Sequence, residues 1–436
     1  MTTRTTEDFA QPCHCAGALV EGHWQRSALR ASLRVMRRFL ALALIALALG
    51  GCTPSPAPSS TAEARTEPGL HQRMLTLDSH IDTPVHFDRP GYDFARRQSF
   101  AEDLTHVDLR RMEGGNLDGG FFVIYTPQGT DQAAMARAAE ARLASTLRTI
   151  ASHSGDIVLA RASSDILSIE HAGKRFAMLS VENSGPLGAD PATWQRWYGA
   201  GVRMAGPVHS RTNQLADSTT GERRWGGLSP EGRAWVALMN RLGIVVDASH
   251  ASDEATRQMA ELSTTPIILS HSGFRAIYDH PRNISDDFAR ELAAKGAVIA
   301  INSVFLSRFN NSDARKPLYE EFDHLPQMPV EAQRDLARRW HDLDQRERVN
   351  EGDIALYVRA VDHCLRLVGP AHCGIGADWD GGGGVRGMED IAALPDVTAR
   401  LQALGWSPRD LAALWAGNTL RLLRIAEQRR ERPALR

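Results

Sequence analysis

Residues 75–84 read Leu-Thr-Leu-Asp-Ser-His-Ile-Asp-Thr-Pro, an apolar run that ends in His80-x-Asp82 and is closed by a proline. This pattern is typical of a buried strand that delivers polar side chains to one end of a sheet or barrel. Because side chains alternate along a strand, we expect His80 and Asp82 to point to the same side. An imidazole and a carboxylate on one side can hold a zinc-like cation. His-x-Asp is common by chance, so the motif gains weight only if other strands end in the same way.

Further apolar runs alternate with helical patterns along the chain. We expect strands at residues 116–126, 175–182, 201–209, 244–250, 265–270, 296–304 and 374–378. Helical patterns cover residues 131–149, 229–242, 351–367, 388–404 and 408–428. Together with the first run, these strands predict parallel βαβ units.

Most of the expected strands end in a residue that can bind a metal: Glu182, His209, His250, His271 and Asp378. In a (β/α)₈ barrel the C-terminal ends of the strands converge on the active site. An open doubly wound sheet would instead bind its ligand at one switch point. We therefore predict a (β/α)₈ TIM barrel. The irregular stretch 305–345 is expected to be an insertion over its mouth.

Each of these polar residues could by itself be a hydrogen-bonded core or surface residue. Taken together, four imidazoles and three carboxylates exceed what one tetrahedral zinc ion needs. Two metals a few ångström apart, bridged by one carboxylate, would use them. Two cations acting on one water lower its pKa enough to give hydroxide at neutral pH.

The composition of the 436-residue chain is that of an ordinary globular protein, with 43% hydrophobic and 23% charged residues. A formal net charge of −2 gives no argument for nucleic-acid binding. Two of the five cysteines, Cys364 and Cys373, lie in the expected barrel. They could pair in an oxidising compartment or stay as buried thiols. We favour thiols, because the sequence does not show whether the geometry allows a bond.

The first seventy residues carry a targeting pattern. Residues 36–52 contain a charged start, an apolar run at 39–49 and Leu-Gly-Gly before Cys52. The apolar run is too short to span a membrane, and the segment resembles a bacterial lipoprotein signal peptide that is lipidated at Cys52. An ordinary secretory signal or an N-terminal anchor is the alternative. Residues 53–70 read as a tether rich in Pro and Ser, and residues 1–35 as a non-native extension before Met36, the expected start.

Several motifs, in this order along residues 72–428, resemble the membrane (renal) dipeptidase family, peptidase family M19. They are His80-Ile81-Asp82, Ser180-Val181-Glu182, Gly201-Val202-Arg203 leading to His209, Gly227-Leu228-Ser229-Pro230, Met239 to Gly243, Asp247-Ala248-Ser249-His250, Ser270-His271-Ser272, Pro281-Arg282-Asn283 with Asp286-Asp287, Gly374 to Gly381, and Gly417 to Arg421. Each motif is weak alone, and the ordered set is specific to the family.

The resemblance implies a (β/α)₈ barrel of the metal-dependent hydrolase type at residues 71–430, with two Zn²⁺ ions and dipeptidase activity. His80 and Asp82 would bind one zinc, His250 and His271 the other, and Glu182 would bridge them. His209 would stabilise the tetrahedral oxyanion or contact the second metal, and Arg282 would hold the substrate carboxylate. Asp378 would accept a proton from the water that bridges the metals, which leaves hydroxide, and would pass this proton to the leaving amine. It would also contact the substrate's amino group.

Three positions depart from the family pattern. Ile81 stands where the family commonly has Asn, and Asn183-Ser184-Gly185 replaces the glycines that usually follow the bridging acid. The family tends to have a substrate-holding aromatic after the seventh barrel strand, where this chain reads Ala300 to Phe305. These changes affect the pocket rather than the metal ligands.

We therefore expect a metallo-dipeptidase (EC 3.4.13.-) in the bacterial cell envelope, lipid-anchored through Cys52 and facing the periplasm or exterior. Dipeptides with a D-residue at the C-terminal position are one candidate substrate class. The resemblance also brings a homodimer into consideration. A binuclear amidohydrolase acting on N-acyl amino acids, lactams or other small amides is the alternative. A lipoprotein that binds ligands without catalysis is a third hypothesis, against which the intact ligand set argues.

Overall fold

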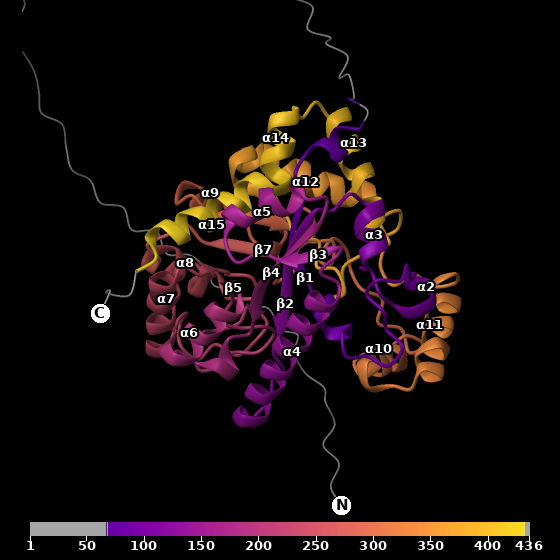
Figure 1. Ribbon diagram of the computed structural model, residues 1–436, viewed down its shortest axis with the longest axis horizontal. Helices are drawn as coiled ribbons and strands as arrows, with labels where there is room; N and C mark the ends of the chain where they lie inside the picture. Colours follow the sequence, from indigo (N-terminus) through magenta and orange to yellow (C-terminus); the bar gives the residue numbers. More distant parts are fainter. Residues whose placement is uncertain (1–66, 68, 432–436) are drawn as a thin grey trace, which may run out of the picture. The chain divides into compact units, whose positions relative to one another are not determined.

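The computed structural model describes residue 67 and residues 69–431. The predictions for residues 1–35, for the signal peptide, for lipidation of Cys52 and for most of the tether fall outside these residues. The described chain forms a parallel sheet that closes into a barrel, so the predicted fold class is confirmed (Figure 1). The barrel strands are β1 (Leu77–Ile81), β2 (Gly119–Tyr125), β4 (Arg175–Glu182), β5 (Val202–Ala205), β6 (Val245–Val246), β7 (Ile268–Ser272), β8 (Val298–Ile301) and β9 (Cys373–Ile375).

Short parallel bridges close the barrel where regular pairing stops. Asp247 pairs with Ile268 and joins β6 to β7, and Ile81 pairs with Trp379 and joins β1 to the segment after β9. The backbone N–H of Asp82 donates to the carbonyl of Trp379 at 2.8 Å. The carboxylate of Asp78 reinforces this seam by accepting the backbone N–H of Ala377 at 3.0 Å. An additional strand that the sequence reading missed, β3 (Ile157–Leu159), pairs with the N-terminal half of β4.

The barrel interior is filled at its N-terminal end by apolar side chains from successive strands. These include Leu77, Phe121, Phe176, Met178, Met204, Val245, Ile268 and Val298. Leu420 and Leu423 of α15 (Asn418–Arg429) pack against the same cluster. Along β4 the inward positions continue from Phe176 and Met178 to Glu182, so one strand supplies both the packed floor and an acid at the mouth.

Register shifts lie where β1 and β7 carry their histidines. The pairing of β1 with β2 shifts between Asp78 and Ile81, and that of β7 with β8 shifts between Leu269 and Ser272. Such bulges re-aim side chains near active sites. The shift lets Leu77 face the barrel interior while His80, three residues on, also faces inward. Simple alternation from Leu77 to His80 therefore does not describe this strand.

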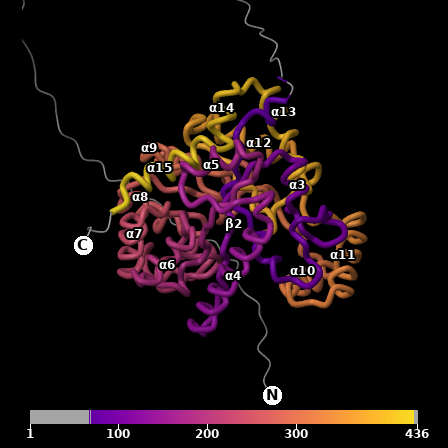
Figure 2. The backbone as a smooth tube through the Cα atoms, viewed as in Figure 1, coloured from indigo at the N-terminus to yellow at the C-terminus, as the bar shows by residue number. Residues whose placement is uncertain are grey.

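Helices surround the barrel and follow the strands in sequence (Figures 1 and 2). They include α1 (Leu70–Arg73), α3 (Leu109–Gly114), α4 (Gln132–Ser152), α5 (Ser163–His171), α6 (Pro191–Ala200), α7 (Pro230–Leu242), α8 (Asp253–Leu262), α9 (Asp286–Ala294), α13 (Leu394–Ala403) and α14 (Pro408–Ala412). Helix α7 begins as predicted, because the Ser229 hydroxyl accepts the Gly232 N–H and Pro230 occupies the first turn. The expected helix at 408–428 is interrupted by a π-helical turn at Ala413–Gly417.

The stretch 305–345, expected to be irregular, is largely helical. It contains α10 (Lys316–Phe322) and α11 (Val330–Asp344), which lie beside α2 (Phe100–Asp103) in Figures 1 and 2. Leu318, Leu336 and Trp340 form a small apolar core there together with Leu104. The insertion therefore shares a small separate core with the segment that follows β1.

Cys364 and Cys373 form a disulfide, so the preference for free thiols was wrong. Cys364 lies on α12 (Ile354–Val368) and Cys373 begins β9, with their Cα atoms 6.1 Å apart. The 3₁₀ turn at Pro370–His372 brings the chain back to the helix, which the sequence alone does not show. Among the described residues, no helix combines the length and apolar character that crossing a membrane requires.

Candidate metal and catalytic site

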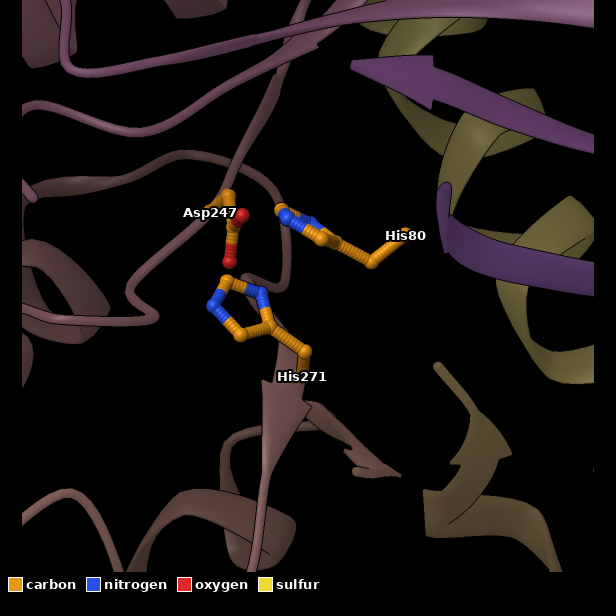
Figure 3. A group of neighbouring side chains, drawn as sticks. All are labelled: His80, Asp247 and His271. Carbon is orange, nitrogen blue, oxygen red and sulfur yellow. The ribbon is translucent and has the colours of Figure 1, made fainter. Parts of the chain in front are cut away.

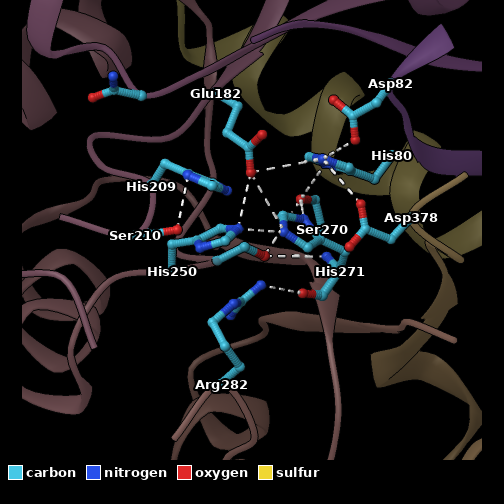
Figure 4. Close-up of polar contacts among 12 residues, drawn as sticks. His80, Asp82, Glu182, His209, Ser210, His250, Ser270, His271, Arg282 and Asp378 are labelled. Atoms are coloured by element: carbon cyan, nitrogen blue, oxygen red, sulfur yellow. Dashed lines mark hydrogen bonds and ion pairs between the residues drawn. The ribbon is translucent and has the colours of Figure 1, made fainter. Parts of the chain in front are cut away.

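The eight side chains that the sequence analysis assigned to the site come together at the C-terminal ends of the strands (Figure 4). His80 lies on β1 and Asp82 directly follows it, Glu182 ends β4, and His271 lies on β7. The others sit on the loops after β5, β6, β7 and β9: His209, His250, Arg282 and Asp378. All are buried except His209, which is half-buried.

One group of possible metal ligands consists of Glu182, His250 and His271. The Nε2 atoms of the two histidines are 2.8 Å apart, and they lie 3.0 and 3.5 Å from Oε1 of Glu182. Neighbouring ligand atoms around a tetrahedral zinc are separated by about 3.3 Å, given metal–nitrogen bonds of about 2.0–2.1 Å. The three atoms therefore already have the spacing of ligands to one ion.

A second group surrounds His80. Its Nε2 is 3.3 Å from Oδ2 of Asp82, 3.9 Å from Oδ1 of Asp378 and 3.8 Å from Oε1 of Glu182. The same oxygen of Glu182 therefore faces both groups. This is the position that a bridging carboxylate needs.

The electrostatics of these groups favour a cation. Burial raises the pKa of Glu182 well above its ordinary value, and burial together with the charge of Asp82 raises the pKa of Asp378 to about 7. Burial lowers the pKa of His80, but the carboxylates of Asp82, Glu182 and Asp378 outweigh it and raise the pKa to about 10. Burial lowers the pKa values of His250 and His271 well below the ordinary range, so both rings are neutral. Neutral imidazoles beside crowded carboxylates are suitable ligands for a divalent metal.

Asp247 was not assigned a role from the sequence, although it lies beside His80 and His271 (Figure 3). Its carboxylate already accepts three hydrogen bonds, from the N–H groups of Ser249 and Ser270 at 3.0 Å each and from the Ser270 hydroxyl at 2.6 Å. It is therefore a hydrogen-bond acceptor for the serine rather than a third ligand group. The signal for it was present, because Asp247 is the first polar residue after the β-branched run of β6.

Ser270 connects this carboxylate to two of the candidate ligands. Its oxygen lies 3.1 Å from Nδ1 of His80 and 2.9 Å from Nδ1 of His271. Since the serine hydrogen is donated to Asp247, both Nδ1 atoms must donate to the serine oxygen. The neutral ring of His271 then presents a lone pair on Nε2 toward Glu182, and His80 does the same in its neutral form. Such outer contacts are typical of metal-binding histidines.

Arg282 reaches the site from the loop after β7. Its Nη2 donates to the carbonyl of His271 at 3.1 Å, and the guanidinium lies 5.4 Å from the ring centre of Phe305. The buried Nε has no hydrogen-bond partner among the described residues. Phe305 thus supplies an aromatic side chain next to Arg282, at the segment where the sequence left the family's aromatic contact in doubt.

The loop after β9 holds Asp378 under constraint. A Cβ at Gly381 would lie 2.3 Å from carboxylate oxygens of both Asp378 and Asp82, so only glycine fits beneath the two acids. Asp380, another residue that the sequence analysis did not single out for the site, anchors this loop from the other side. It accepts hydrogen bonds from the His106 N–H at 2.6 Å and from the Thr83 hydroxyl at 2.5 Å.

Two buried ring nitrogens of the cluster, Nε2 of His80 and Nδ1 of His250, have no hydrogen-bond partner among the described residues. Buried polar atoms are rarely left in this condition, and where they are a function or an ion usually explains them. Together with the spacing of Glu182, His250 and His271, the unpartnered Nε2 of His80 indicates that the residues fit metal binding.

Comparisons with known proteins agree with the barrel fold and indicate the family. The family model described as membrane dipeptidase (peptidase family M19) matches residues 64–435. Dipeptidase tcpJ of Claviceps purpurea is 28% identical over 366 residues, which cover 80% of this chain and 76% of that protein. The crystal structure of the probable dipeptidase PvdM from Pseudomonas aeruginosa is similar with a TM-score of 0.70 and 28% identity, covering 83% of this chain and 97% of that one.

A metallo peptidase from Rhodobacter sphaeroides also shares the fold, with a TM-score of 0.65 and 22% identity over 80% of this chain and 99% of that one. Its structure holds a phosphinate mimic of the dipeptide L-Ala-D-Ala.

Proposed function

The chain belongs to the membrane dipeptidase family, peptidase family M19, and from that membership we propose that it hydrolyses dipeptides with two zinc ions held at the barrel mouth. The coarser statement, a metal-dependent dipeptidase, follows from the family itself. The observation that carries the proposal is the position of Glu182 Oε1, which faces the Nε2 atoms of His250, His271 and His80 at 3.0, 3.5 and 3.8 Å.

The metal ligands in this proposal are His80 and Asp82 for one ion and His250 and His271 for the other, with Glu182 shared. Bound zinc ions would polarise the scissile carbonyl and lower the pKa of a water so that hydroxide forms near neutral pH. The protein's part is to fix these ligands on a rigid frame. The hydrogen bonds of Ser270 and the glycine beneath Asp82 do this.

Arg282, His209 and Asp378 would handle the substrate. Arg282 would bind the C-terminal carboxylate through its planar guanidinium, whose Nε has no hydrogen-bond partner in the described part of the chain. His209 would donate a hydrogen bond to the carbonyl oxygen as negative charge develops on it. Asp378, whose pKa is raised above its ordinary value by burial and by the charge of Asp82, would accept the proton of the attacking water and deliver it to the leaving amine.

The substrate class is proposed to include dipeptides with a D-residue in the C-terminal position. The ligand of the Rhodobacter sphaeroides structure, a mimic of L-Ala-D-Ala, supports this choice. The alternative, hydrolysis of N-acyl amino acids or lactams, was motivated by the missing aromatic contact. Phe305 lies against Arg282 and weakens that motive.

One experiment tests both readings. The full-length protein is purified, its metal content is measured, and it is assayed on L-L and L-D dipeptides, N-acyl amino acids and a lactam, with and without chelator. About two zinc ions per chain and chelator-sensitive dipeptide cleavage are expected. Turnover of the N-acyl substrates or the lactam in preference to dipeptides would contradict the dipeptide proposal while keeping the metal site.

We also propose that the protein works outside the cytoplasm, anchored by a lipid on Cys52. The signal-like residues 36–52 support this, and so does the Cys364–Cys373 disulfide, because structural disulfides persist in oxidising compartments. Replacing Cys52 by alanine should move the protein from the membrane fraction to the soluble fraction. Retention of the variant in the membrane would contradict the lipid anchor. Dimerisation stays a prediction, to be read from the mass of the purified protein in solution.

A further inference from the structure

A neutral imidazole carries one ring hydrogen, and the contact at one nitrogen decides what the other can do. In the neutral forms of His80 and His271 the Ser270 oxygen receives the Nδ1 hydrogens, which leaves lone pairs on both Nε2 atoms. His209 sits in the same mouth, with its ring centre only 4.2 Å from that of His250. Its Nδ1, however, meets a different kind of partner.

That partner is Gln128, in the loop that follows β2. Oε1 of Gln128 accepts the backbone N–H of Arg211 at 2.7 Å, which fixes the orientation of the side-chain amide. The amide nitrogen then faces Nδ1 of His209 at 2.9 Å. An amide NH₂ can only donate, so Nδ1 of His209 must be an acceptor without a hydrogen.

The neighbouring Ser210 hydroxyl is compatible with this assignment. Its oxygen lies 2.9 Å from the same Nδ1, and a hydroxyl can donate to a nitrogen lone pair. Both contacts therefore act on one ring nitrogen. The ring hydrogen is left on Nε2.

We propose that Gln128 is a positioning residue that holds His209 in the tautomer with hydrogen on Nε2, so that His209 donates to the substrate carbonyl oxygen and does not bind metal. This inference rests on the proposed function for the identity of the acceptor, a peptide carbonyl. It separates the two roles that the sequence left open for His209, because a ring nitrogen that carries a hydrogen has no lone pair for a metal.

The first test reads the tautomer directly and needs no substrate. The full-length, zinc-loaded protein is labelled with ¹⁵N-histidine, and the His209 signals are assigned by their loss in His209→Asn. The wild type should show a bare Nδ1 and a protonated Nε2. In Gln128→Glu, which keeps the side-chain shape, the carboxylate should draw a hydrogen onto Nδ1. A protonated Nδ1 in the wild type, or no change in Gln128→Glu, overturns the proposal.

Ser210→Ala is the matched control. It removes the other polar contact of the same nitrogen and leaves the Gln128 amide in place, so the wild-type tautomer should persist. If Ser210→Ala instead puts a hydrogen on Nδ1, the serine and not Gln128 sets the tautomer, and the proposal is wrong.

Kinetics add a second readout. Complete loss of an oxyanion donor typically lowers kcat by about 10²–10³-fold. Gln128→Leu should lower kcat by about 10–100-fold with little change in KM, since His209 itself remains. A raised KM at unchanged kcat would overturn the proposal. Absence of dipeptide turnover in the wild type, with the expected tautomer, would count against the proposed function alone.

Discussion

Buried histidines at the two ends of the barrel differ in whether their ring nitrogens have hydrogen-bond partners. At the N-terminal end, His71 on α1 has both ring nitrogens paired, Nδ1 with the Thr398 hydroxyl at 2.6 Å and Nε2 with the Gly115 carbonyl at 3.0 Å. At the mouth, His80 and His250 each keep one buried ring nitrogen without a hydrogen-bond partner in the described chain. Both surroundings are buried, so burial alone does not separate the two ends.

The difference lies in what the polar atoms converge on. The contacts of His71 join α1 to α13 and to the segment before β2, and the ring packs edge-on against Trp415. They stabilise the fold and leave no atom for a ligand. At the mouth, Nε2 of His80 faces the carboxylates of Asp82, Glu182 and Asp378 without a hydrogen-bond partner among the described residues, which costs stability unless an ion satisfies it. The paired nitrogens of His71 therefore serve the fold, whereas the unpartnered nitrogen of His80 lies among candidate metal ligands.

The largest effect should come from Glu182→Gln, which removes the charge shared by both ligand groups. A metal site contributes several kcal/mol to the transition state, so dipeptidase activity should fall by about 10³-fold or more and zinc content below two per chain. Activity assays and metal analysis check this. Glu261→Gln, on the exposed side of α8, is the control. A fully metallated, active Glu182→Gln protein would show that the carboxylate of Glu182 is not needed for metal binding or catalysis.

At the opposite end, pH should reveal His71. Burial lowers its pKa to about 4 from 6.5, so the unfolded chain takes up a proton between these values and the folded chain does not. Stability is therefore complete above pH 6.5 and falls as the pH drops toward 4. The loss is 6.5 − 4 = 2.5 pH units at about 1.36 kcal/mol each, or about 3 kcal/mol in all.

Denaturant unfolding at pH 7 and pH 4.5 checks this prediction. His71→Gln cannot titrate, so it should lose less stability than the wild type over this interval. Equal losses in the two proteins would mean that other groups carry the acid sensitivity. Dipeptidase activity at pH 7 should be unaffected, because His71 lies at the end of the barrel away from the mouth.

The substrate side of the mouth can be tested through Arg282. Replacing it by alanine should remove about 2 kcal/mol of binding to a free carboxylate, or about 30-fold in kcat/KM. The effect should vanish for a dipeptide with a C-terminal amide, which has no carboxylate to bind. Arg290→Ala, exposed on α9, is the control. An equal loss of kcat/KM on both substrates would mean that Arg282 stabilises the fold and does not bind the substrate carboxylate. Arg282 would then resemble His71 at the other end of the barrel.

The smallest effect concerns Ser270, which belongs to neither ligand group but orients both. Ser270→Ala should weaken zinc binding by about tenfold, at the low end of the range for outer-shell contacts. Competition with a chromogenic chelator measures it. Ser272→Ala is the matched control on β7, since its hydroxyl contacts the Arg282 carbonyl and no ring nitrogen. Equal zinc affinity in Ser270→Ala and the wild type would remove the serine from the site.

The sequence predicted the order of the barrel strands and the helices α4, α7, α12, α13, α14 and α15, because apolar runs and helical periodicity are local properties. It did not predict α5, α6, α8 and α9. It missed β3, the helices of the 305–345 insertion and the Cys364–Cys373 bond, which depend on partners distant along the chain or on turn geometry. The bulges on β1 and β7 also escaped it. Pairing register is a tertiary property that alternation alone does not predict.

For the site, the sequence supplied the ligand types but not their hydrogen bonds. Strand-end position was enough to select His80, Glu182 and His271, and the structure brings them within 4 Å of one another. The spacing of residues in the sequence does not distinguish His209 from these histidines. Which ring nitrogen of His209 carries the hydrogen depends on Gln128, and Gln128 belongs to no sequence motif. Asp247 was overlooked because His250, the more familiar ligand, stands three residues later.

The seam between β1 and the segment after β9 joins residues 299 positions apart, as the hydrogen bond from Ala377 to Asp78 shows. His80 and Asp82 are thus made early in translation, while their neighbour Asp378 is made near the end. Domains form as units, and contacts between distant residues are slow to assemble. A nascent chain stopped before residue 373 lacks β9 and the segment after it, which close the barrel. The group of possible ligands formed by His80, Asp82 and Asp378 can therefore be completed only once the polypeptide is almost finished.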